Sequence, residues 1–199
     1  MTGIKYDFNF LAGIYLDNEL LLNNFTMNLY IDVESKNPEE QSIAFNRIDF
    51  IMQEIIENGI FVVEEDKETI ELYDAIGLKV LTLDKAGSHD QIILMTITDK
   101  LNAITENALT IYKSTLSSKK GGYIEYIYWT SVQKSSDSPL ISNDPAKWWN
   151  DKTLQCTGIH NADDTDIQKE ITWATIKMDW PNDPKDTKDD SDNIVTLPQ

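Results

Sequence analysis

The sequence predicts an α+β fold, in which an antiparallel sheet built from two β-hairpins carries two main helices on one face. Apolar and polar residues alternate over positions 6–33 and again over positions 109–129, which is the pattern of half-buried strands. Between these runs, segments 37–58 and 88–107 repeat their apolar residues every three or four positions, as amphipathic helices do. The predicted order is therefore ββ-α-α-ββ, followed by a C-terminal extension.

The first hairpin is predicted by period-two alternation on both sides of a turn. The later run places an apolar residue at every second position: Phe25, Met27, Leu29, Ile31 and Val33. The earlier run starts at Tyr6 and continues to Leu16, and Asp17-Asn18 supplies turn residues between the two. We therefore expect a long antiparallel hairpin with one buried face.

The first helix has clear start and stop signals. Asn37 can cap it, Pro38 suits its first position, and Glu40 can reach back to the cap. The pair Asn58-Gly59 is expected to end it. The side chains that we expect to pack across the hairpin are Ala44, Ile48, Ile51 and Ile55, widened by Phe45 and Ile56.

An insertion and a second helix follow. Residues 60–63 and 78–83 predict short strands, and residues 66–76 between them predict a short acidic helix that ends at Gly77. Ser88 and Gln91 have the spacing of a capping box, which predicts a second long helix from Ser88 to about Asn107. Its apolar face comprises Ile93, Ile97, Leu101 and Ile104. The second hairpin pairs 109–116 with 123–129 around the turn residues 117–122.

Composition divides the chain into three parts. Residues 1–132 form the predicted α+β core domain, and residues 133–180 form a Trp-rich extension that packs on or borders this core. Residues 181–199 are too polar to bury much surface and predict a disordered acidic tail. Within the extension, residues 170–180 predict one more strand, in which the alternating side chains are Ala174, Ile176, Met178 and Trp180.

The net charge of −17 narrows the classes of partner. Nucleic-acid binders neutralise phosphates with clustered lysine and arginine, and anionic membranes also attract basic segments. No apolar run reaches the length of about 18–20 residues that a spanning helix needs, and the first ten residues lack the pattern of a secretory signal. We expect protein partners, no direct binding of nucleic acid or membrane, and a cytoplasmic location.

The sequence offers no pattern typical of a catalytic, metal or cofactor site. His89 and His160 have no neighbouring ligands at zinc spacing, and Cys156 precedes His160 by only four positions. Glu54 and Glu57 lie one helical turn apart, an ordinary arrangement on a surface helix. We therefore predict no catalytic residue, no metal ligand and no cofactor, and hence a protein that is not an enzyme.

Three residues are candidates for an interface: Trp148, Trp149 and Arg47. The two tryptophans lie in a segment of poor regular patterning. Either one anchors the segment and the other is free for a partner, or both hold a long loop to its own domain. Arg47 is the sole arginine and lies on the first helix, which suggests a specific ion pair or an interface contact.

The order ββ-α-α-ββ is similar to the tunnelling fold, whose members include pterin synthases, GTP cyclohydrolase and urate oxidase. The segment ITENALTIYKSTL also resembles the Thr-x-Glu-Asn helix of the pterin synthases. This resemblance implies assembly as a ring with a continuous barrel. The zinc histidines of that family have no counterpart in the hairpins here, so the resemblance extends to the architecture alone.

Residues 88–113 and the later WWND segment resemble an uncharacterised protein of large contractile-tailed bacteriophages. The resemblance implies a viral protein that resides in the host cytoplasm or in the virion.

Three functional hypotheses follow. The first is a non-enzymatic bacteriophage protein, a homo-oligomeric virion structural or assembly component that acts through protein–protein contacts. The second is an acidic inhibitor that mimics nucleic acid and occupies the basic groove of a host enzyme. The third is a tunnelling-fold enzyme that acts on a purine or pterin, in which Glu106 or Glu125 would hold the ring nitrogens at a subunit boundary.

Overall fold

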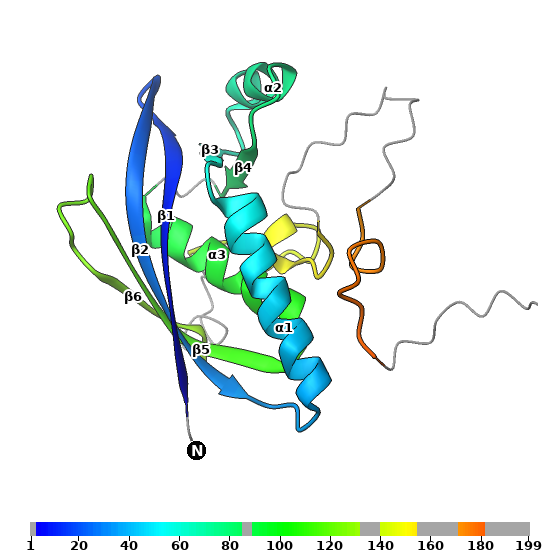
Figure 1. Ribbon diagram of the computed structural model, residues 1–199. Helices are drawn as coiled ribbons and strands as arrows, with labels where there is room; N and C mark the ends of the chain where they lie inside the picture. The colour runs from blue at the N-terminus through cyan, green and yellow to red at the C-terminus, as the bar shows by residue number, and fades with distance from the viewer. Residues whose placement is uncertain (1–2, 85–88, 132–139, 155–170, 182–199) are drawn as a thin grey trace, which may run out of the picture.

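The computed structural model describes residues 3–84, 89–131, 140–154 and 171–181. Within these residues, a mixed sheet of order β4-β3-β1-β2-β5-β6 has helices α1 and α3 on one face (Figure 1). The predicted α+β class is confirmed. The strands are β1 (Ile4–Leu16), β2 (Glu19–Val33), β3 (Ile60–Val63), β4 (Val80–Leu83), β5 (Leu109–Ser118) and β6 (Tyr126–Trp129). The helices are α1 (Pro38–Phe50), α2 (Lys67–Ala75) and α3 (Asp90–Thr105), with a π-helical continuation η1 (Ile51–Ile56) and a 3-10 turn η2 (Trp148–Asn150).

The first hairpin forms as predicted. Strands β1 and β2 pair antiparallel from Ile4 opposite Ile31 to Leu16 opposite Glu19. Asp17 and Asn18 both adopt positive φ, as a two-residue hairpin turn requires. The alternating apolar residues of β2 are buried against the helices, and the polar residues between them face outward. The sheet therefore has a core face and an outer face.

Helix α1 begins at the predicted cap. The Asn37 Oδ1 atom accepts a hydrogen bond from the Glu39 amide at 3.0 Å, and Glu40 accepts one from the Asn37 side-chain amide at 3.3 Å. The predicted end at Asn58 is also correct, because Asn58 adopts a φ of 60°. For α3, Ser88 lies outside the described residues, and His89 occupies the N-cap position without a side-chain capping bond.

The sheet differs from the predicted antiparallel one because the insertion adds two parallel strands. Strand β3 pairs parallel with β1 at Gly13 opposite Ile60, and β4 pairs parallel with β3. Helix α2 buries Ile70 in a small cluster with the alternate residues Ile60, Val62 and Val80, whereas Phe61, Leu81 and Leu83 join the main core. Since successive strand residues face opposite sides, α2 covers the outer face at this end of the sheet.

The main core lies between the sheet and helices α1 and α3. Ile48 of α1, Ile97 of α3 and Met27 of β2 are fully buried there. Trp149 and Trp173 belong to the same cluster, so the Trp-rich extension packs on this core.

The predicted strand over residues 170–180 is wrong in the part that the structure describes. Residues 171–181 form turns, in which Met178 N bonds to Trp173 O at 2.8 Å and Lys177 adopts a φ of 61°. The apolar residues of this segment pack individually and do not line one face of a strand, since Trp173 is buried while Ala174 is exposed. The predicted tail beyond Pro181 and the domain boundary at 132–133 involve residues outside the described ranges.

Among the described helices, none combines the length and hydrophobicity that a bilayer crossing requires.

Candidate functional site

Arg47 lies at the centre of a polar cluster that joins α1, the end of α3 and the C-terminal segment. Its side chain is 1% exposed. Its Nη1 atom donates to Glu106 Oε1 at 3.0 Å and to Ile104 O at 2.9 Å, and its Nε atom donates to Met178 O at 2.9 Å. Of the two predicted roles for the sole arginine, the structure shows the specific ion pair.

Two tryptophans of the C-terminal segment lie close to the Arg47 guanidinium. Its carbon lies 4.5 Å from the ring centroid of Trp173 and 4.1 Å from that of Trp180, which are cation–π distances. Trp180 Nε1 donates to Glu106 Oε1 at 2.9 Å, and Trp173 Nε1 donates to Lys152 O at 2.8 Å. These contacts bind residues 171–181 to α1 and to the end of α3. Arg47 is buried within the chain, so it does not present an interface to a partner.

Glu106 is held by three donors. Besides Arg47 and Trp180 on Oε1, its Oε2 atom accepts from Lys152 Nζ at 3.0 Å. Burial alone would raise the pKa of Glu106, but the hydrogen bonds from Trp180, Lys152 and Arg47 together lower the pKa below its usual value. The carboxylate is therefore ionised and largely occupied, which leaves it poorly placed to hold the ring nitrogens of a purine or pterin.

A pocket of about 400 Å³ adjoins this cluster. It lies where β2 ends, α1 begins and α3 ends, and it is lined by Glu34, Ser35, Glu40, Glu106, Asn107, Ala108 and Trp180. Ser35 Oγ donates to Glu40 Oε2 at 2.5 Å. The described residues contain no group of histidine, cysteine and carboxylate side chains arranged to hold a metal ion.

Lys100 anchors the Trp-bearing loop and was not singled out by the sequence analysis. It is fully buried on α3, and its Nζ donates to Trp148 O at 3.0 Å, Asp151 O at 2.8 Å and Thr153 O at 2.7 Å. Its position three residues after Ile97 places a lysine within the apolar stripe. A lysine within an apolar stripe indicates a buried charge that needs acceptors, and this signal was available in the sequence.

Trp148 and Trp149 are both buried, at 4% and 0% exposure. Trp148 Nε1 donates to Thr82 O of β4 at 2.8 Å, and Trp149 Nε1 donates to Ser142 O at 3.0 Å. The expectation that one of them is free for a partner is not met, and both hold the loop to its own domain. Lys147 adds an ion pair to Glu64 after β3. This loop therefore covers the β4 edge of the sheet.

The β6 edge is different. Among the described residues, only β5 pairs with β6, through the register Lys113–Trp129 to Leu116–Tyr126. Large apolar side chains are exposed along this edge and in the turn before it: Tyr123 at 70%, Ile124 at 61%, Ile127 at 55% and Trp129 at 46%. The β5–β6 hairpin forms the left rim of the molecule in Figure 1.

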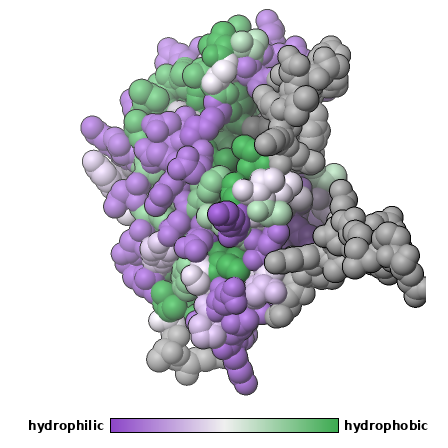
Figure 2. All heavy atoms as spheres, turned by 45° about the vertical axis from the view of Figure 1, so that its right-hand side comes forward, coloured by the Kyte–Doolittle hydropathy of each residue, from purple (hydrophilic) through white to green (hydrophobic). Residues whose placement is uncertain are grey.

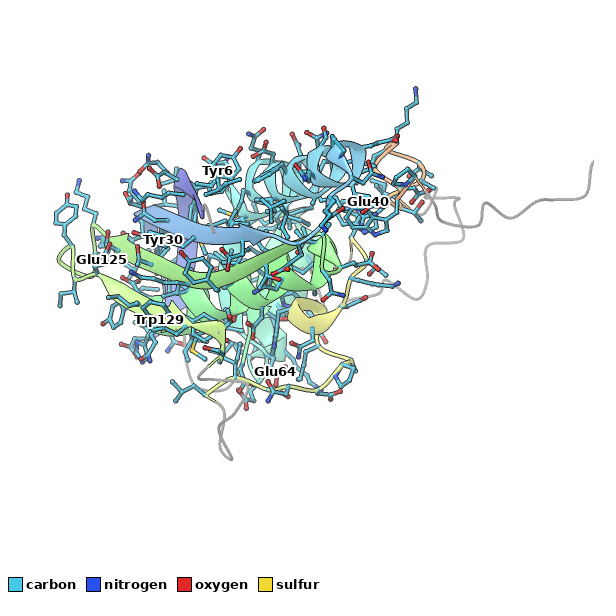
Figure 3. All side chains as sticks on the ribbon, turned by 90° about the horizontal axis from the view of Figure 1, so that it is seen from below. Tyr6, Tyr30, Glu40, Glu64, Glu125 and Trp129 are labelled. Atoms are coloured by element: carbon cyan, nitrogen blue, oxygen red, sulfur yellow. The ribbon has the colours of Figure 1, made fainter. Side chains whose placement is uncertain are left out.

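The outer face beside β6 combines aromatic and polar groups. Lys113 Nζ lies 4.5 Å from the ring centroid of Tyr30 and 5.0 Å from that of Trp129. Two residue pairs further along, Thr115 Oγ1 donates to Glu125 at 3.0 Å and accepts from Asn28 at 2.9 Å. Figure 3 shows Tyr30, Glu125 and Trp129 together on one side of the molecule, away from Glu40.

A second apolar area lies around α2. Figure 2 shows a face on which hydrophobic residues gather toward the top, where α2 lies, with smaller hydrophobic areas among hydrophilic residues below. The exposed apolar residues of that region are Leu72, Ile76 and Leu78. Glu68, Glu71 and Asp74 lie on the same helix, so this second apolar patch has an acidic surround.

The remaining sequence candidates do not converge on one place. Glu57 Oε2 accepts the Leu11 amide at 3.2 Å, which gives it a structural role beside β1. The backbone carbonyls of Glu54 and Glu57 accept from Lys79 Nζ at 3.0 and 2.6 Å. Cys156 and His160 lie outside the described residues.

Comparison with known proteins adds no assignment to this geometry. No protein-family model matches the chain, and no curated protein is significantly similar to it.

Proposed function

We propose that the protein is a non-enzymatic, homo-oligomeric structural or assembly component that acts through protein–protein contacts. The observation that carries this proposal is the apolar edge at β6, which pairs only with β5 among the described residues. Soluble monomers normally protect such edges with charge, proline, bulges or a covering segment. The chain covers its β4 edge with the Trp148–Trp149 loop, whereas the described residues leave β6 paired on one side only.

The architecture supports the proposal at the level of the sheet. The two hairpins lie side by side as β1-β2-β5-β6, with α1 and α3 on one face, and β3 and β4 extend the sheet beyond β1. The bacteriophage setting rests on the sequence resemblance of residues 88–113 and of the WWND segment. The occupied state of Glu106 disfavours the purine or pterin enzyme as an alternative.

Light scattering after size exclusion, at low and high salt and over a range of concentrations, tests the proposal. We expect a mass that is a multiple of the 22.8 kDa chain, with apolar contacts that persist at high salt. A monomer at every concentration and salt would contradict self-association. A monomer that binds a basic protein only at low salt would instead support the nucleic-acid mimic.

A further inference from the structure

We propose that a second copy of this chain occupies the β6 edge, with the two β6 strands paired antiparallel about a two-fold axis at Ile127. This inference rests on the proposed function, because it names the contact through which self-association takes place. The pairing would join two sheets into one and keep the helices of both copies on the same side.

The two edges of the sheet restrict the symmetry. All four residues of β4 are buried, and the outward carbonyl of Thr82 accepts from Trp148 Nε1. Head-to-tail pairing of β6 with β4 of another copy would have to displace this loop, which Lys100 and the Glu64–Lys147 ion pair also hold. Only a like-with-like contact remains for edge pairing, and such an isologous contact closes as a dimer.

The sequence of β6 suits a partner strand. It reads Tyr126-Ile127-Tyr128-Trp129, with no charge, proline or glycine. Ile127 and Trp129 alternate on the outer face, and both are about half exposed. A strand of this composition at an open edge is a template for β-pairing. Contact of these side chains with a second copy would reduce their exposed apolar surface.

The register follows from the alternation of faces. Directly opposite residues in an antiparallel pair point to the same side of the sheet. If both outer faces remain outward, odd-numbered residues of β6 must meet odd-numbered residues of the second copy. Pairing Ile127 with its own counterpart satisfies this condition and centres the contact on the strand. Glu125 of the second copy then lies opposite Trp129.

Charge complementarity supports this register. Lys113 pairs with Trp129 across β5 and β6, so Lys113 and Glu125 of the second copy would flank Trp129 on the outer face. Two strand spacings separate their Cα atoms by about 10 Å, which long lysine and glutamate side chains can span. The two-fold axis would create this ion pair twice. Residues 109–131 also carry three lysines against one glutamate, so this hairpin does not add to the repulsion between two −17 chains.

Two isoleucine-to-lysine variants test the location of the contact. Ile127→Lys places like charges against each other on the axis, and Ile76→Lys makes the same change at the isoleucine directly after α2, which is 64% exposed. We expect Ile127→Lys to weaken dimerisation at least tenfold without changing the circular dichroism spectrum, and Ile76→Lys to leave the dimer mass unchanged. An Ile127→Lys variant that keeps the wild-type mass would overturn the edge contact and leave self-association intact. A monomeric wild type would overturn both.

A charge exchange tests the register separately. Lys113→Glu should weaken the dimer because it faces Glu125 of the second copy, and the double variant Lys113→Glu with Glu125→Lys should restore most of the lost affinity. In one chain Glu125 lies four positions along the hairpin from Trp129, the residue that pairs with Lys113, so restoration must come from the second copy. If the double variant dimerises no better than the single one, the proposed register is wrong.

Discussion

At the scale of single residues, Arg47 shows what an arginine supplies that a lysine does not. Its planar group donates to one carboxylate and two carbonyls, and two tryptophan rings lie at cation–π distance from it. A lysine supplies a point charge without the flat fork or the stacked faces. The rarity of arginine in the sequence was enough to predict a specific partner for Arg47, but not which carboxylate.

Arg47→Ala should lower the free energy of unfolding by about 3 kcal/mol or more, because it leaves Glu106 and two carbonyls without their donor. The free energy of unfolding of Arg47→Lys should lie between those of Arg47→Ala and the wild type. Urea titration followed by circular dichroism measures both. Lys5→Ala is the control, since the Lys5–Asp7 pair is about half exposed, and it should change the free energy by less than about 0.5 kcal/mol. If Arg47→Ala lowers the free energy of unfolding no more than Lys5→Ala does, Arg47 does not stabilise the contact between α1 and residues 171–181.

Glu106 makes part of the stability depend on pH. Because its folded pKa is lowered, the unfolded chain binds a proton more readily, and stability is lost as the pH falls through the folded pKa. Relative to Glu106→Gln, the wild type should therefore be more stable at about pH 7 and should lose this advantage below about pH 4. Urea titrations of both proteins across that range measure the difference. An advantage that stays constant or grows toward acid pH would contradict the ionised role of Glu106.

At the scale of elements, the loop around η2 depends on a lysine. Lys100→Met preserves much of the side-chain volume but leaves the carbonyls of Trp148, Asp151 and Thr153 without their donor. We expect a loss of about 3 kcal/mol in unfolding free energy and faster proteolysis near residues 148–153. Lys79→Met is the matched control, because the exposed Lys79 also donates to two carbonyls, and it should cost about 1 kcal/mol or less. Equal losses in the two variants would mean that burial gives Lys100 no special role.

The hairpins and helices were predictable because each is defined by neighbours in the sequence. The alternation of apolar residues predicts β2 from its own residues, and Asn37 predicts the start of α1 in the same way. The parallel pairing of β3 with β1 was not predictable, since the Gly13–Ile60 contact depends on tertiary packing. The strand predicted over residues 170–180 was wrong because apolar residues at alternate positions can also pack individually onto the core, as Trp173 does. The covered β4 edge was hidden for a related reason: the Trp148 loop reaches it from 66 positions away.

At the scale of the whole molecule, the charge distribution sets how the chain can associate. The chain carries −17 overall, whereas its β5–β6 hairpin carries more lysine than acid. Raising the salt from about 50 to about 500 mM should therefore tighten the dimer, because screening reduces repulsion between the acidic bodies more than it weakens two rim ion pairs. Sedimentation equilibrium at the two salt concentrations measures the dissociation constant. A looser dimer at high salt would show that charge attraction, and not apolar contact, dominates the interface.

The most direct test of the central claim, a two-fold contact at β6, is oxidation of an Ile127→Cys variant in a Cys156→Ser background. Residue 127 then carries the sole thiol, and directly opposite residues of an antiparallel pair lie close enough for a disulfide after a small adjustment. The account predicts rapid formation of a disulfide-linked dimer at low protein concentration, while Ile76→Cys in the same background stays monomeric under denaturing, non-reducing conditions. Slow linkage at position 127, no faster than at position 76, would contradict it.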